Sequence, residues 1–268
     1  MPHPKMPELS KLLAILALVV SLAGCVTTSD SPFAREADKD KAVKNYVQLA
    51  TAYIAQGNFD RARSHLERAL DINPDSPAAL SAMGLVHQRN GETKLAQETF
   101  QQALSEDPDY TRGHVYYGAF LYGEGEYQKA RDQFSIASED TGYEERASVF
   151  YNLGRIEARL GNTGKAAAAF ERSVNLSRGD PRYLLALSAI LVELGNYDAA
   201  AAYYNRLTDL MRHDPKLRHS PESLITGIRI ARHFQNRNQE SSLALLLKNQ
   251  YPTSDQYQQY KVLIANDE

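Results

Sequence analysis

Small and apolar residues repeat along this chain with a spacing of about 34 residues. Each repeat has a glycine, an alanine five residues later and a bulky apolar or aromatic residue four residues after that. The glycines follow one another at intervals of 34, 34, 36 and 34 residues. The three sets are Gly57, Gly91, Gly125, Gly161 and Gly195; Ala62, Ala96, Ala130, Ala166 and Ala200; and Leu66, Phe100, Phe134, Phe170 and Tyr204. This period predicts a protein built from repeated supersecondary units.

A second set of positions precedes each turn glycine, namely Ala50, Gly84, Gly118, Gly154 and Ser188. Pro74 and Pro108 recur after the second half of the unit. This pattern is typical of the tetratricopeptide repeat, which the chain resembles. The turn glycine lets one helix fold back on the other, and the small residues let the two helices approach closely. The pattern therefore predicts an all-α fold, a tetratricopeptide repeat superhelix (α-solenoid) of about six helical hairpins.

The repeat domain is expected over residues 42–254. Its five regular units are 43–76, 77–110, 111–146, 147–180 and 181–214, and a degenerate sixth is expected at 220–254. A capping helix is expected over 255–268, where Asp255 is an N-cap candidate.

The N-terminus has the features of an export signal over residues 1–24. Lys5 and Lys11 precede a short apolar core that is too short to span a bilayer. The run Leu22-Ala23-Gly24-Cys25 resembles the bacterial lipobox, so Cys25 is expected to carry lipid and to become the first mature residue. The alternative is an ordinary secretory signal with an unrelated cysteine.

Residues 25–41 are polar and lack apolar periodicity, which indicates a lipidated flexible tether. Val26 after the lipidated cysteine favours the outer membrane over the inner. With one cysteine in 268 residues the chain can form no internal disulfide, so packing alone must stabilise the fold.

Composition narrows the function classes. The chain has no Trp, 16 Tyr and a formal net charge of −3, which gives no footprint for nucleic-acid binding. The seven histidines lack the spacing of a zinc hydrolase, and the glycines near Gly118 and Gly125 have no following Gly-Lys-Ser/Thr. We therefore predict no active site, metal, cofactor or small-molecule substrate.

The first helix of each unit is expected to line a concave groove. Apolar residues recur there at positions that the fold itself does not need to fill: Val47, Ile54, Leu85, Val115, Tyr122, Tyr151, Leu185 and Val192. Arg112, Arg155, Arg159 and Arg182 are interleaved with them. Such a groove suits an extended or helical apolar peptide that carries carboxylates. The alternative is that these side chains pack on one another or on a terminal segment.

A closer family resemblance comes from the third unit. Tyr117-Gly118-Ala119-Phe120-Leu121, followed by Gly125, is similar to a segment of the type IV pilus biogenesis/stability lipoproteins, the pilotins. Many relatives have cysteines where this chain has Tyr122 and Ile156, so the disulfide of those relatives is absent here.

The resemblance implies an outer-membrane lipoprotein on the periplasmic face, bound to the membrane through its lipid. Such a protein binds the pilus secretin and promotes its outer-membrane localisation and multimerisation, and hence pilus extrusion and twitching motility. The alternative function is a periplasmic repeat scaffold for cell-wall synthesis or hydrolysis enzymes.

Overall fold

The computed structural model describes residues 32–265, with side chains from Glu36 onward. Cys25 and the export signal lie outside these residues. The described part of the chain consists of thirteen helices and contains no strand. The helices are α2 (Pro32–Ala55), α3 (Phe59–Ile72), α4 (Pro77–Arg89), α5 (Thr93–Glu106), α6 (Thr111–Gly123), α7 (Tyr127–Glu139), α8 (Arg146–Arg159), α9 (Thr163–Leu176), α10 (Pro181–Glu193), α11 (Tyr197–His213), α12 (Pro221–His233), α13 (Arg237–Gln250) and α14 (Asp255–Ala265).

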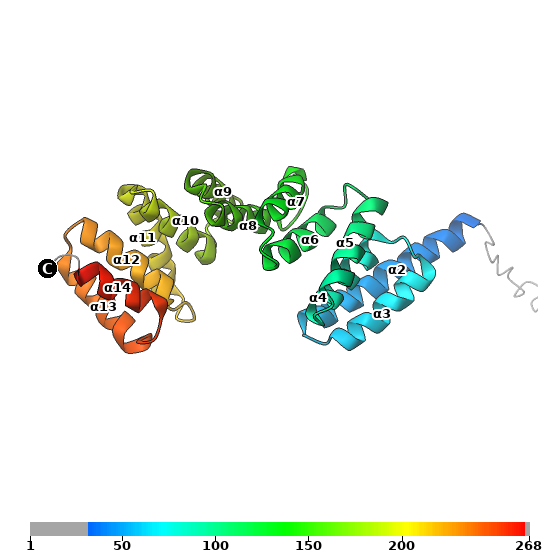
Figure 1. Ribbon diagram of the computed structural model, residues 1–268, viewed down its shortest axis with the longest axis horizontal. Coiled ribbons are helices and arrows are strands. Elements are labelled where there is room, and N and C mark those ends of the chain that lie inside the picture. The colour runs from blue at the N-terminus through cyan, green and yellow to red at the C-terminus, as the bar shows by residue number, and fades with distance from the viewer. Residues whose placement is uncertain (1–31, 266–268) are drawn as a thin grey trace, which may run out of the picture.

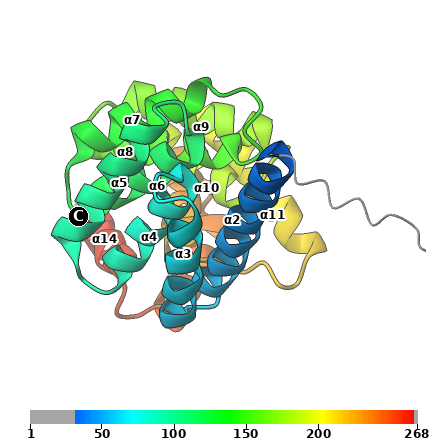
Figure 2. The same ribbon diagram turned by 90° about the vertical axis from the view of Figure 1, so that its right-hand side faces the viewer.

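These helices form six antiparallel hairpins, α2–α3 to α12–α13, followed by α14 (Figure 1). The expected all-α superhelix of about six hairpins is confirmed. The hairpins are arranged as an arch, with α6, α8 and α10 towards its inner side and α7 and α9 on its outer side (Figure 1). Seen along the long axis, the successive hairpins wind around that axis instead of lying in one plane (Figure 2).

The turns inside the hairpins explain the period of the glycines. Gly57, Gly91, Gly125, Gly161 and Gly195 all have φ between +74° and +80°. This left-handed conformation ends the first helix and is strained for residues that carry a Cβ. In the sixth hairpin Gln235 takes this conformation, with φ of 57°. The sixth hairpin therefore forms without a turn glycine, which is why the glycine pattern in the sequence stops at the fifth unit.

The 36-residue interval has a structural location as well. The two extra residues of the third unit lie in the connection between α7 and α8, which spans residues 140–145. Asp140 organises this loop, because it accepts hydrogen bonds from the Thr111 hydroxyl (2.6 Å) and the Gly142 amide (2.9 Å).

The N-terminal prediction needs a correction. Residues 32–41, which we expected to belong to the flexible tether, are the first turns of α2. The side chains of residues 36–41 are exposed, so this part of the helix leaves no apolar periodicity in the sequence. Ala37, Lys39 and Lys41 favour helix, and the packed turns from Val43 onward supply the nucleus from which it extends.

The core is a series of apolar layers between neighbouring hairpins. Ala50, Leu66 and Val86 are fully buried between the first two units. Phe100, Phe134 and Phe170 continue the series towards the middle units. No helix in residues 32–265 is long and apolar enough to cross a membrane.

Candidate partner-binding surface

The residues that we expected in the groove lie on the inner helices, but they differ in exposure. Seven are half-buried: Val47, Ile54, Leu85, Val115, Tyr122, Tyr151 and Leu185. Arg155 is exposed. The half-buried side chains also pack against the core layers. These positions therefore fit both interpretations, contact with a ligand in the groove and packing within the protein. One part of each side chain stabilises the solenoid and the other part is available to a ligand.

Val192 does not belong to this surface. It is only 6% exposed and is part of the core between the fourth and sixth units. The interpretation of Val192 as a groove residue is therefore wrong. The position lies near the C-terminal end of α10, where α10 packs directly on α12 and so covers it.

At the N-terminal end of the inner surface, the structure brings Val47 and Arg112 to one cavity. This cavity has a volume of about 350 Å³. Its walls come from α2, α4 and α6 and include Val43, Lys44, Val47, Ala78, Tyr110 and Arg112. Burial raises the pKa of Tyr110 and of the nearby Tyr116, so both hydroxyls stay protonated at neutral pH. The cavity therefore combines apolar side chains with the Arg112 guanidinium, the Lys44 ammonium and the carboxylate of Asp40.

In the middle of the inner surface, Arg155 of α8 joins two of the predicted tyrosines. Its guanidinium carbon lies 4.7 Å from the ring centre of Tyr122 and 5.8 Å from that of Tyr151. Arg155 Nη2 also donates a hydrogen bond to the Tyr122 hydroxyl at 3.3 Å. The Tyr151 ring continues the contact to Tyr183 of α10, with ring centres 5.0 Å apart. Tyr122, Tyr151 and Arg155 thus form one surface across the third and fourth units.

The four interleaved arginines are not equivalent. Arg182 donates from Nε and Nη2 to the two carboxylate oxygens of Asp180, at 3.1 and 3.0 Å. These hydrogen bonds lower the pKa of Asp180, so its carboxylate stays charged and keeps Arg182 occupied. Arg155 instead contacts the Tyr122 side chain, and the Tyr122 hydroxyl raises the pKa of Arg159.

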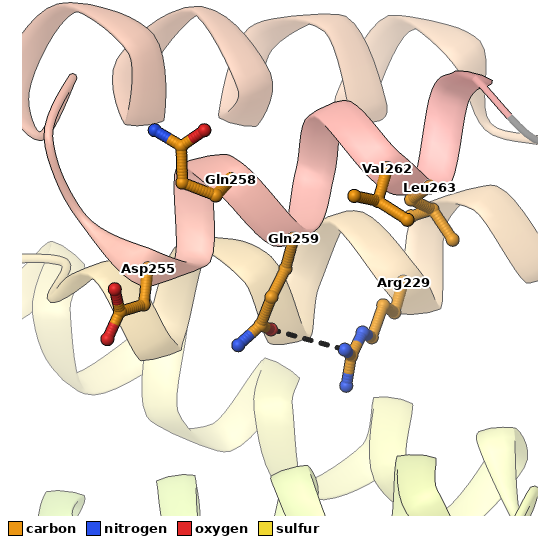
Figure 3. Close-up of a pocket in the computed structure, with 6 residues that line it drawn as sticks. All are labelled: Arg229, Asp255, Gln258, Gln259, Val262 and Leu263. Carbon is orange, nitrogen blue, oxygen red and sulfur yellow. Dashed lines mark hydrogen bonds between the residues drawn. The ribbon is translucent and has the colours of Figure 1, made fainter.

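A further cavity, which the sequence did not indicate, lies between α12 and α14 (Figure 3). It has a volume of about 470 Å³. Asp255, Gln258, Gln259 and Val262 line it from one face of α14. Across the cavity Arg229 donates a hydrogen bond to Gln259 Oε1 at 3.3 Å. These four residues are three or four positions apart, which places them on one face of a helix. This spacing is the only sequence signal for the face, because few of its residues are apolar.

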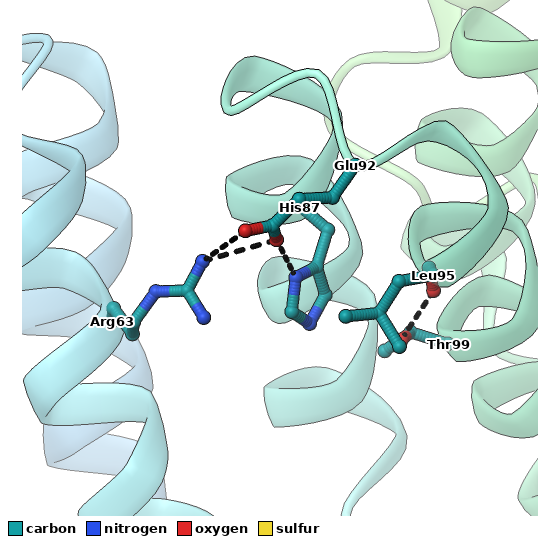
Figure 4. Close-up of polar contacts among 5 residues, drawn as sticks. All are labelled: Arg63, His87, Glu92, Leu95 and Thr99. Carbon is teal, nitrogen blue, oxygen red and sulfur yellow. Dashed lines mark hydrogen bonds and ion pairs between the residues drawn. The ribbon is translucent and has the colours of Figure 1, made fainter.

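Two buried histidines within the described residues make structural contacts. Buried His87 bonds through Nδ1 to the Glu92 carboxylate, which also accepts from Arg63 of the preceding unit at 3.1 Å (Figure 4). Buried His114 contacts Gln133 Oε1 and the Pro108 carbonyl oxygen, at 2.8 and 2.7 Å. Both residues therefore join helices. Within residues 32–265 no group of three or more His, Cys, Asp or Glu side chains is placed to hold a metal ion.

Known proteins give an independent comparison. Family models of the tetratricopeptide repeat match residues 42–105, 81–144, 121–181 and 151–215. The chain is 36% identical over 248 residues to type IV pilus assembly protein PilF of Pseudomonas aeruginosa, covering 92% of this chain and 96% of that protein. A relative at this identity and coverage shows common family membership.

Solved structures agree with this comparison. The P. aeruginosa PilF structure superposes with a TM-score of 0.76 at 34% sequence identity, covering 84% of this chain and 99% of that one. The crystal structure of PilW, a type IV pilus biogenesis factor, superposes with a TM-score of 0.67 at 24% identity, covering 81% and 97% of the two chains. At that identity the second match supports the fold alone.

Proposed function

Because this chain belongs to the tetratricopeptide repeat proteins of type IV pilus biogenesis, the family of PilF, we propose that it binds the pilus secretin as an outer-membrane lipoprotein. In this role it promotes the outer-membrane localisation and multimerisation of the secretin. It works by binding and delivery, without catalysis.

The observation that carries the proposal is the inner surface of the arch. Half-buried apolar side chains such as Val47, Val115 and Tyr151 follow one another along the inner helices, and arginines lie between them. Such a surface holds an extended or helical segment of another protein through apolar contacts and directional hydrogen bonds. A secretin segment bound there would be kept from unproductive association before the subunit inserts.

Lipid on Cys25 supplies the second half of the proposed role. Several buried acyl chains anchor a protein to a membrane effectively permanently. A subunit held by the repeats would then be carried to the membrane together with the anchor. Membrane attachment also raises the local concentration of subunits, which favours multimer formation.

A semi-native gel of outer membranes, probed for the secretin, tests both halves. We compare the wild type, a strain without this protein and a strain with Cys25→Ala. The proposal expects the heat-stable multimer to disappear in the deletion strain. With Cys25→Ala it expects multimers in the wrong membrane, which would assign delivery to the lipid and assembly to the repeats.

Normal multimers in the correct membrane in all three strains would reject the proposed function. Cell-wall synthesis and hydrolysis enzymes would then be the partners to test by capture on the full-length protein.

A further inference from the structure

Three side chains that carry hydrogen-bond donor groups lie where the third unit joins the fourth. Arg155 and Arg159 lie one helical turn apart on α8, and Tyr122 reaches them from the end of α6. Arg155 lies over the Tyr122 ring and bonds to its hydroxyl. The Tyr122 hydroxyl also raises the pKa of Arg159, and the Tyr127 hydroxyl adds to this shift. The Arg155 guanidinium is thus held beside the phenol of Tyr122, and Arg159 follows one helical turn later on the same helix.

These two arginines have no acidic partner within residues 32–265. Other arginines of the chain do: Arg182 pairs with Asp180, Arg63 with Glu92 and Arg232 with Glu240. Two adjacent positive charges without a counter-charge are electrostatically unfavourable for the folded chain alone. The arrangement therefore favours an anionic group supplied from outside.

The hydrogen bonds already formed leave most donors free. Arg155 uses one nitrogen on Tyr122 and another in a long contact of 3.5 Å to Asn152. The Tyr122 hydroxyl accepts from Arg155, so its own proton remains available for a second bond. The two guanidinium forks and this O–H group can surround a carboxylate, which has two oxygens and accepts from several donors.

Both arginines are exposed, and exposed ion pairs usually contribute little, because ordering a long side chain offsets the attraction. Here the Tyr122 ring already orders the Arg155 guanidinium, so less conformational entropy is lost when a ligand binds. Tyr151, which is half-buried, lies beside Arg155 and offers apolar contact to a residue next to a bound carboxylate.

We propose that Tyr122, Arg155 and Arg159 form a subsite that binds the side-chain carboxylate of an Asp or Glu in a partner peptide lying along the inner surface. The inference rests on the proposed function in that the ligand is a protein segment. It adds the chemistry of that segment: apolar residues with an acidic residue at the junction of the third and fourth units.

An array of immobilised, C-terminally amidated peptides tests the subsite. One set consists of random apolar-rich 12-residue peptides in matched pairs, with Asp or Glu in one member and Asn or Gln in the other. A second set tiles the periplasmic part of the secretin. Each array is probed with the whole purified chain as wild type, as Arg155→Gln/Arg159→Gln and as Arg172→Gln.

Arg172 is the matched control, because its guanidinium also lies over an aromatic ring, 4.4 Å from the centre of Phe150, but on the outer helix α9. We expect the wild type and Arg172→Gln to bind the acidic member of a pair about tenfold more tightly. The double variant should lose this preference while it melts at the wild-type temperature.

Equal binding of both members by the wild type, or a preference that survives in the double variant, would overturn the subsite. These outcomes come from the random set and do not involve the secretin. If the chain prefers the acidic peptides of the random set but binds no peptide of the secretin set, the result would count against the proposed function and would still support the subsite.

Discussion

The ring of Phe170 lies so close to Gly154 that a Cβ added to this glycine would be 2.5 Å from the nearest ring carbons. The same relationship recurs between Gly118 and Phe134 at 2.8 Å, and between Gly84 and Phe100 at 2.7 Å. In these three hairpins, the bulky residue of the second helix occupies the space that a side chain on the first helix would need. The small residue and the bulky residue are therefore one structural feature.

Gly118→Ala should destabilise the chain by about 1–3 kcal/mol, because the buried Phe134 ring must move to admit the methyl group. Gly118→Val should cost more, because it adds two further carbon atoms at the same place. Thermal or urea unfolding followed by circular dichroism measures both.

Gly164→Ala on α9 is the matched control. A Cβ there meets nothing within 4 Å, so alanine should leave the stability unchanged or raise it by up to about 1 kcal/mol. If both alanine variants lowered the melting temperature equally, close packing would not be the reason for glycine at position 118.

These pairs explain why the sequence predicts the fold so fully. The turn glycines, the small residues and the bulky residues serve the same local geometry in the first five hairpins, so the pattern is repeated along the chain. The sixth hairpin shows where the signal weakens, because Gln235 adopts the left-handed turn in place of glycine. Helices α12 and α13 still form, since Leu224, Ile228 and Leu247 are fully buried between them.

The binding surface is less predictable, because exposure depends on neighbouring units. Val192 and Leu185 lie on the same helix and are both apolar, yet only Val192 is covered. Arg182 and Arg155 look alike in the sequence, but Asp180 occupies the first, while Tyr122, 33 residues away, orients the second. The cover on Val192 and the contact of Arg155 with Tyr122 follow from the stacking of hairpins, which a single repeat does not encode, whereas Asp180 lies only two residues before Arg182.

The contact between the first two units should make stability depend on pH. Hydrogen bonds from His87 and then from Arg63 lower the pKa of Glu92 below its ordinary value. A carboxyl group with a depressed pKa in the folded state stabilises that state above its unfolded pKa, and this contribution is lost as the pH falls through the folded pKa. Glu92→Gln should therefore lower the melting temperature at pH 7 and have little effect at about pH 3.

Glu98→Gln provides the comparison, since Glu98 pairs only with the exposed Lys94 of the same helix, at 3.8 Å. Such pairs contribute little, so this variant should follow the wild type at every pH. A melting difference for Glu92→Gln that stayed constant from pH 7 to pH 3 would show that the Glu92 charge is not the stabilising feature.

The N-terminal turns of α2 should be dispensable for stability. The side chains of residues 36–39 are exposed, so a chain that begins at Asp40 should unfold within about 0.5 kcal/mol of the longer one. Val43→Ala should cost about 1–2 kcal/mol, because Val43 is 7% exposed and packs in the first core layer. Urea unfolding of both proteins checks this. A large loss on truncation would mean that the early turns pack on something.

Substitutions of Tyr122 should separate binding from folding. Its ring is half-buried beneath Arg155 of the next unit and contacts Tyr127 of its own hairpin, with ring centres 5.4 Å apart. Tyr122→Ala should lose much less stability than Gly118→Val and yet weaken capture of the secretin.

Tyr122→Phe keeps the ring under Arg155 and removes only the hydroxyl, so its capture should fall between the wild type and Tyr122→Ala. Pull-down of the secretin by each variant, with a melting curve for each preparation, checks the order. If Tyr122→Ala and Gly118→Val lost stability equally, Tyr122 would be a core residue and its place in the binding surface would be wrong.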